Sequence, residues 1–133
     1  MKHLIVSVAL AVALLPAAVP AAGLTFPEVV DAVDRNAHTK LNIKDYWGEV
    51  RGKEVTWSGV VYDVEPGKSH VRILVTDKSR PLYHGYNIRV YTQDRTKASN
   101  LKRGQRIQFR GLLHNYHSKD AGAVIDVNEA TVY

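Results

Sequence analysis

Residues 54–64 read EVTWSGVVYDV, and this stretch decides the fold. It is rich in β-branched and aromatic residues and is followed by a Pro-Gly turn pair, so it predicts a long β-strand. Gly59 lies in its middle, where a glycine permits a bulge or sharp coiling. Residues 105–116 form a second long stretch, which carries Gly111 in the same way. We therefore expect two long, coiled strands that each serve both halves of one sheet.

Shorter segments complete a pattern of five strands. Residues 70–76 and 86–92 alternate apolar and polar side chains, and residues 123–133 form a last strand. The polar residues 94–101, between the third and fourth strands, could form one helical turn. This order predicts an OB-fold, a five-stranded Greek-key barrel. The alternative that the pattern leaves open is an unclosed five-stranded sandwich.

A helix is predicted before the strands, at about residues 26–36. Thr25 and Glu28 form a Thr-x-x-Glu capping box, in which each side chain satisfies a free backbone N–H at the helix start. Residues 45–50 are expected to form a second, short helical turn. One apolar stripe along the first helix is formed by Phe26, Val29, Val30 and Val33.

Residues 1–22 have the pattern of a secretory signal peptide. A lysine precedes an apolar run at residues 4–15, a proline ends the run, and small residues follow. The run is too short to span a membrane, which takes about 20 apolar residues. Cleavage after Ala21 or Ala22 leaves one domain, residues 23–133, with no stable membrane insertion. We expect this domain to be periplasmic or secreted.

The composition excludes several kinds of functional site. The 133 residues include no cysteine, which excludes a disulfide scaffold, a Cys-ligated zinc site and a thiol nucleophile. Loss of Lys2 with the signal peptide lowers the formal net charge from +5 to +4, an excess too modest to indicate nucleic acid by itself. His114 and His117 are spaced to lie on opposite faces of a strand, which suits metal chelation poorly. We expect no metal site and no cofactor.

Two motifs resemble those of the bacterial tRNA-anti-like OB-fold family. Residues 51–61, RGKEVTWSGVV, resemble its GK-x-V-x-x-x-G-x-V segment, and residues 101–111, LKRGQRIQFRG, resemble its L-x-x-G-x-x-V-x-x-x-G segment. The resemblance covers about residues 26–133 and implies an OB-fold of the small exported kind. It implies nucleic-acid binding only as a habit of the family, because many exported members have no assigned role.

The usual ligand platform of an OB barrel is the outer face of strands two and three, with the loops that join strands one to two and four to five. Cations beside aromatic rings on such a face suit an extended anionic chain. The candidate ligand-binding residues are Lys68, His70, Arg72, Arg89, Tyr91, Tyr116, His117 and Lys119. The alternative is an ordinary solvated surface, on which Leu74 packs under a loop at residues 77–85.

Other side chains have structural interpretations. Trp57 and Tyr62 lie on opposite faces of the first strand, so one of them is expected in the core. Trp47 is expected to cover one barrel mouth. The outward arginines of the fourth strand, Arg106 and Arg110, are expected to pair with Asp126 or Glu129 on the fifth strand. The alternative is that they extend a basic stripe.

Three functions fit this sequence. The first is an exported module that binds single-stranded nucleic acid or an acidic oligosaccharide. The second, equally favoured, is a module that docks on an envelope or secretion-system protein by an edge strand or by the apolar stripe of its helix. The third is a nuclease that uses Asp63, Glu65, Asp77 and Asp94. Because the sequence has no nucleophile–base motif or phosphate-binding loop, we do not expect an enzyme.

Overall fold

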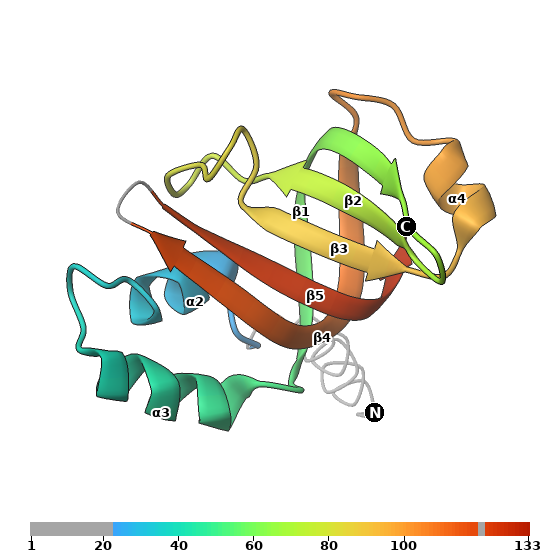
Figure 1. The fold of residues 1–133 in the computed structure, drawn as a ribbon. Helices are drawn as coiled ribbons and strands as arrows, with labels where there is room; N and C mark the ends of the chain where they lie inside the picture. The colour runs from blue at the N-terminus through green and yellow to red at the C-terminus, as the bar shows by residue number, and fades with distance from the viewer. Residues whose placement is uncertain (1–22, 120–121) are drawn as a thin grey trace, which may run out of the picture.

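A computed structural model describes residues 23–119 and 122–133, in which helices and strands follow one another in the predicted order (Figure 1). The helices are α2 (Phe26–Ala32), α3 (Lys40–Val50) and α4 (Arg95–Ser99). The strands are β1 (Glu54–Pro66), β2 (Val71–Thr76), β3 (Ile88–Thr92), β4 (Arg106–Lys119) and β5 (Gly122–Val132). The predicted signal peptide lies outside the described residues.

The five strands close into a barrel in the order β1-β2-β3-β5-β4. Strands β3 and β5 are parallel, and the other neighbours are antiparallel. Strand β1 joins the two halves because it pairs with β4 from Glu54 to Val60 and with β2 from Val60 to Pro66. This order and closure define an OB-fold. The predicted mainly-β barrel with an N-terminal helix is confirmed, and the unclosed sandwich is excluded.

Two glycines allow neighbouring strands to approach closely enough for closure. A Cβ at Gly59 would lie 2.8 Å from the backbone oxygen of Thr76. A Cβ at Gly111 would lie 2.7 Å from the backbone oxygen of Asn128. Backbone atoms cannot move aside as a flexible side chain can, so a residue with a Cβ would force the strands apart at both positions.

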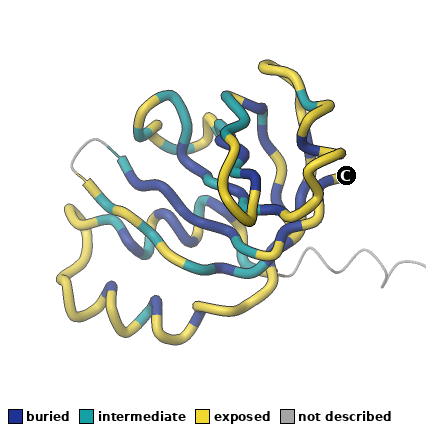
Figure 2. The backbone as a smooth tube through the Cα atoms, turned by 45° about the vertical axis from the view of Figure 1, so that its right-hand side comes forward, coloured by how far each residue is buried: buried dark blue, intermediate teal, exposed yellow. Residues whose placement is uncertain are grey.

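The barrel encloses one apolar core (Figure 2). Phe109, Ile73 and Val90 come from three different strands and are fully buried. Trp57 also points inward, whereas Tyr62 remains exposed on the opposite face of β1, which resolves the expectation for this pair. The alternation of the strands thus separates a dry interior from an outer face that can carry a site.

Helix α2 covers the barrel through its predicted stripe, since Phe26, Val29, Val30 and Val33 are all buried. The capping box is present: Glu28 N donates to Thr25 Oγ1 at 3.2 Å, and Thr25 N donates to Glu28 Oε1 at 3.0 Å. The helix is held against the barrel because the Phe26 ring packs edge-on against Trp57, with the ring centres 5.3 Å apart. The Trp57 indole N–H also donates to the Leu24 carbonyl at 2.9 Å.

The helix bounds differ from those predicted. Helix α2 ends at Ala32 rather than near residue 36, because Asp34 Oδ1 accepts from Asn36 N at 2.8 Å and holds a turn there. Helix α3 starts earlier than the predicted turn at residues 45–50, because the Thr39 hydroxyl caps its N-terminus. Trp47 on α3 is buried, and its ring packs edge-on against Tyr116 of β4 with the ring centres 4.9 Å apart.

We expect Gly59→Ala and Gly111→Ala each to lower the free energy of unfolding by about 1–3 kcal/mol, because the added methyl group overpacks a strand contact. Gly48→Ala is the matched control. Gly48 lies inside α3 with no atom within 4 Å of its Cβ position, so alanine there should raise stability by about 0.5–1 kcal/mol. Urea denaturation measures all three. If the three substitutions changed the free energy of unfolding equally, close approach of the strands at Gly59 and Gly111 would not be what these glycines provide.

Candidate ligand-binding face

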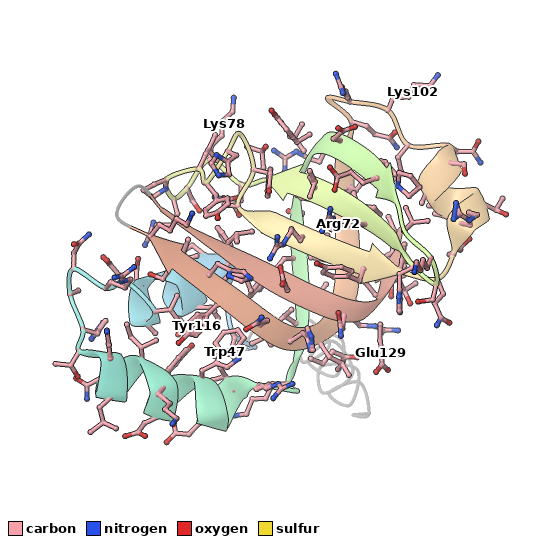
Figure 3. The ribbon with its side chains drawn as sticks, in the orientation of Figure 1. Trp47, Arg72, Lys78, Lys102, Tyr116 and Glu129 are labelled. Atoms are coloured by element: carbon pink, nitrogen blue, oxygen red, sulfur yellow. The ribbon has the colours of Figure 1, made fainter. Side chains whose placement is uncertain are left out.

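The register of β2 and β3 places three candidate side chains and Leu74 on one face. Arg72 lies opposite Tyr91, and Leu74 lies opposite Arg89. Side chains paired across antiparallel strands project to the same side. The intervening Ile73 is fully buried in the core, so this face is the outer one. Arg72 lies on the side of β2 and β3 that faces the viewer in Figure 3.

The end of this face nearest the β1–β2 turn is hollowed into a groove of about 260 Å³. We call it the basic groove, and it is lined by Pro66, Gly67, Lys68, Ser69, His70, Arg72 and Tyr91. Four of the eight candidate residues therefore meet in one hollow. The Arg95 guanidinium, at the start of α4, donates to the Gly67 carbonyl at 3.3 Å and links the turn to that helix.

Arg72 is oriented within this groove. Its Nε donates to Glu65 Oε1 at 2.7 Å, and its side chain remains 41% exposed. The Tyr91 hydroxyl and the Glu65 carboxylate together raise the pKa of Arg72 above its ordinary value. The guanidinium therefore stays charged, with one edge fixed by β1 and the rest of its surface open to the groove.

Arg89 has a different environment, although it lies on the same face. Its Nε and Nη2 donate to Asp126 Oδ1 and Oδ2 at 2.6 and 3.1 Å, a bidentate pair. Its side chain is 17% exposed. Burial alone would lower the pKa of Arg89, but the Asp126 carboxylate outweighs burial and keeps the pKa above its ordinary value. The charge of Arg89 is thus compensated within the protein.

The prediction that Asp126 would pair with an arginine of the fourth strand is wrong. Strand β5 runs parallel to β3, which places Asp126 directly beside Arg89. Alternation along single strands cannot reveal this parallel neighbour. Of the two arginines concerned, Arg110 lies 3.7 Å from Glu54 on β1, and Arg106 remains exposed.

The loop between β2 and β3, residues 77–87, closes the other end of the face, and we call it the strap. Leu74 projects outward yet is only 4% exposed. The strap lies against the start of β5, where the Leu82 carbonyl oxygen is 3.1 Å from the Cβ position of Gly122. The alternative interpretation of Leu74 as covered therefore holds for this end of the face, whereas the basic groove stays open.

A buried asparagine and one ion pair hold the strap in place. Asn87 is fully buried; its Nδ2 donates to the Asp77 carbonyl at 2.7 Å, and its Oδ1 accepts from Asp77 N at 2.9 Å. Arg80 forms a bidentate pair with Asp31 of α2, with both bonds at 2.7 Å. The sequence analysis assigned Asn87 to a strand and missed this role.

The three candidates near the end of β4 separate from one another. All three lie in the strand, which runs on to Lys119 and so includes His117 and Lys119, for which a loop was predicted. Tyr116 is partly buried and packs with Trp47 between α3 and β4, away from the basic groove (Figure 3). His117 is exposed and pairs with Val124 of β5. Lys119 is exposed, and its Nζ lies 5.2 Å from the ring centre of Tyr83.

The sequence analysis also missed an aromatic cluster beside the strap, which we call the tyrosine patch: Tyr62, Tyr83 and Tyr86. The rings of Tyr62 and Tyr86 lie 5.8 Å apart, and those of Tyr83 and Tyr86 lie 6.0 Å apart. Two tyrosines around Gly85 in a loop are a signal that could have indicated such a cluster. Tyr62 joins them from a strand distant in the sequence, which only the fold reveals.

The carboxylates considered for a nuclease each have a local partner. Asp63 lies 3.4 Å from Arg103, Glu65 pairs with Arg72, Asp77 accepts from Ser79 N, and Asp94 accepts from Lys97 N. Within residues 23–119 and 122–133, no group of three or more His, Asp or Glu side chains is placed to hold a metal ion. No helix in the same ranges is long and apolar enough to cross a membrane.

No protein-family model matches the chain, and neither does any curated protein. Among solved structures, the chain is similar to an OBody bound to hen egg-white lysozyme, with a TM-score of 0.45 and 19% identity over 63% of this chain and 82% of that one. It is also similar to asparaginyl-tRNA synthetase from Pyrococcus horikoshii, with a TM-score of 0.45 and 20% identity over 63% of this chain and 20% of that one. The chain thus spans about a fifth of the synthetase.

A third similar structure is the S. pombe Stn1-Ten1 complex, with a TM-score of 0.42 and 13% identity over 60% of this chain and 57% of that one. The class of this protein, an OB-fold barrel, follows from its own strand order and closure.

We expect Asp126→Ala to lower the free energy of unfolding by about 2–4 kcal/mol, because it leaves Arg89 charged and largely buried without a partner. Glu54→Ala is the control, since its partner Arg110 is half exposed and 3.7 Å away, and the loss there should stay below about 1 kcal/mol. Urea denaturation compares the two variants. A similar loss in both would contradict the internal role of the Arg89 pair.

The strap contact predicts a pH-dependent contribution to stability. The hydrogen bond from Arg80 lowers the pKa of Asp31 below its ordinary value of 3.8. The stabilisation from the Asp31–Arg80 pair is therefore fully present above pH 3.8 and is lost as the pH falls through the lowered pKa of Asp31. Asp31→Asn should lower the melting temperature by about 1–4 °C at neutral pH, and this difference should vanish in acid. Asp45→Asn on α3 serves as a control that should leave the melting temperature unchanged both at neutral pH and in acid.

Proposed function

We propose that this protein is an exported OB-fold module that binds an extended anionic ligand at the basic groove. The observation that carries the proposal is the meeting of Lys68, His70, Arg72 and Tyr91 in one hollow of the outer face. Cationic side chains attract anionic groups over long range, and an aromatic ring beside them offers a surface on which a ligand ring can stack.

The groove suits an anion for two further reasons. No acidic residue is among those that line it. Glu65 fixes one edge of Arg72 before any ligand arrives, so less side-chain freedom is lost on binding than for an unrestrained arginine. At about 260 Å³ the groove is small for a whole ligand. It suits one segment of a longer chain that continues along the face.

Docking on an envelope protein is the weaker candidate. The sequence suggested two docking surfaces, an edge strand and the apolar stripe of the first helix. The described strands form a closed barrel, and Val29 and Val33 of the stripe are fully buried in the core cluster. Both surfaces are thus used within the molecule, which favours a ligand on the open groove.

Export and the absence of catalysis belong to the proposal. The pattern of residues 1–22 supports export. A binding role is supported by the engagement of Asp63, Glu65, Asp77 and Asp94 with local partners rather than with one another. The module would then hold its ligand outside the cytoplasm without changing it.

We expect Arg72→Ala to weaken the binding of an anionic oligomer about tenfold at low ionic strength and to reduce the salt dependence of binding by about one ion. Arg110→Ala is a closely matched control, because Arg110 is also about half exposed and also lies beside a β1 glutamate. It should leave affinity nearly unchanged. Fluorescence polarisation with a labelled single-stranded oligonucleotide and a labelled acidic oligosaccharide measures both variants.

Two results would count against the proposal. If neither probe binds at low ionic strength, the groove is not an anion-binding site. If Arg72→Ala and Arg110→Ala weaken binding equally, the attraction comes from overall charge rather than from this groove.

A further inference from the structure

The tyrosine patch lies at the surface, where Tyr62 is exposed and Tyr83 and Tyr86 are partly buried, and the barrel does not need these rings for its core. Tyr62 is 45% exposed, and none of Tyr62, Tyr83 and Tyr86 belongs to the core cluster. The Tyr62 and Tyr86 ring planes are inclined by 45°, and those of Tyr83 and Tyr86 by 53°. The neighbouring rings are therefore inclined to one another and do not form one flat platform.

The patch is held in a fixed shape. Gly85 has φ 92, and a Cβ there would lie 2.5 Å from Tyr62 Cε1, so this position fits glycine both in conformation and in space. The Thr76 hydroxyl donates to the Gly85 carbonyl at 2.5 Å. With the Asn87 hydrogen bonds, these contacts join the strap to β1 and β2. A site that is ordered before binding loses less conformational entropy when a ligand arrives.

The patch and the basic groove lie at two ends of the same face. Along β1 the chain runs from the exposed Tyr62 of the patch to Glu65, which holds Arg72 in the groove. Three residues of strand span roughly 10 Å, so a short stretch of an oligomer covers this distance. Lys119 supplies a cation beside Tyr83 at the far end. One extended ligand can therefore reach both sites.

We infer that the ligand of this face is an acidic glycan, whose sugar rings stack on the tyrosine patch while its acidic groups meet Arg72 and Lys119. This inference rests on the proposed function and names its ligand class. Sugar rings are puckered and turn relative to one another along a glycan, which matches rings that turn by 45° and 53°. The bases of a stacked single strand stay nearly parallel, which matches this arrangement less well.

The chemistry of tyrosine supports the same choice. The ring stacks on the C–H face of a sugar, and the hydroxyl group at its rim can donate to or accept from a sugar hydroxyl. Lys119 lies where it can pair with the carboxylate of a uronic acid. Apolar burial alone would be equally well served by phenylalanine, so replacing single tyrosines with phenylalanine separates stacking from hydrogen bonding.

The test measures binding of three anionic chains to the mature protein by isothermal titration calorimetry at low ionic strength. Oligogalacturonate carries acidic sugar rings, polyphosphate carries charge without rings, and oligothymidylate carries charge with planar bases. The variants are Tyr62→Ala, Tyr83→Ala and Lys119→Gln. Tyr133→Ala is the matched control, because Tyr133 is 52% exposed, has Arg110 at 6.0 Å from its ring centre, and follows the end of β5 without belonging to the patch.

We expect Tyr62→Ala and Tyr83→Ala each to weaken oligogalacturonate binding about tenfold and to leave polyphosphate binding unchanged. Tyr133→Ala should change neither, and Tyr83→Phe should weaken oligogalacturonate binding by a smaller factor. Lys119→Gln, which leaves the rings in place, should also weaken oligogalacturonate. It keeps the test decisive if a tyrosine variant fails to fold by circular dichroism.

The outcomes separate the two proposals. If Arg72→Ala weakens polyphosphate while the patch variants leave oligogalacturonate unchanged, the glycan inference is overturned and the groove stands. If the patch variants weaken oligothymidylate instead, the ligand is a single-stranded nucleic acid and the inference is again overturned. If none of the three chains binds, both proposals fall.

Discussion

Close approach of backbone without an intervening Cβ is the constraint on which this barrel depends. At Gly59 and Gly111 a neighbouring backbone oxygen occupies the space that a methyl group would take. Strand β1 can then coil enough to pair with β4 along its first half and with β2 along its second. Closure in turn fixes which side of every strand faces water, and hence where charged side chains meet.

Closure also divides the outer face into two unlike halves. Parallel pairing of β3 with β5 places Asp126 beside Arg89, so the charge of this arginine is compensated by an internal ion pair. Arg72 is paired as well, but its partner holds only one edge and leaves it open to the groove. Two arginines on one face, equivalent by alternation, thus have different capacities for a ligand.

Much of the architecture could be predicted because it depends on patterns within short stretches of the sequence. The capping box at Thr25 marks the start of its own helix, and the mid-strand glycines mark where their own strands can coil. These local patterns were therefore enough to predict the helix, the strand order and the barrel. The rest depends on contacts distant in sequence. Asp126 meets Arg89 across a parallel pair, Tyr62 meets Gly85 across a bulge, and the burial of Asn87 depends on a loop path that no periodicity encodes.

The position of β5 has a consequence for assembly. It follows β3 and β4 in the chain and is the neighbour of both, so these two strands keep unpaired edges until β5 is available. Non-local pairing of this kind slows folding, because distant segments must be ordered before their contacts reward it. The barrel cannot close before β5 pairs, and a variant without β5 would leave two open edges that other strands could join.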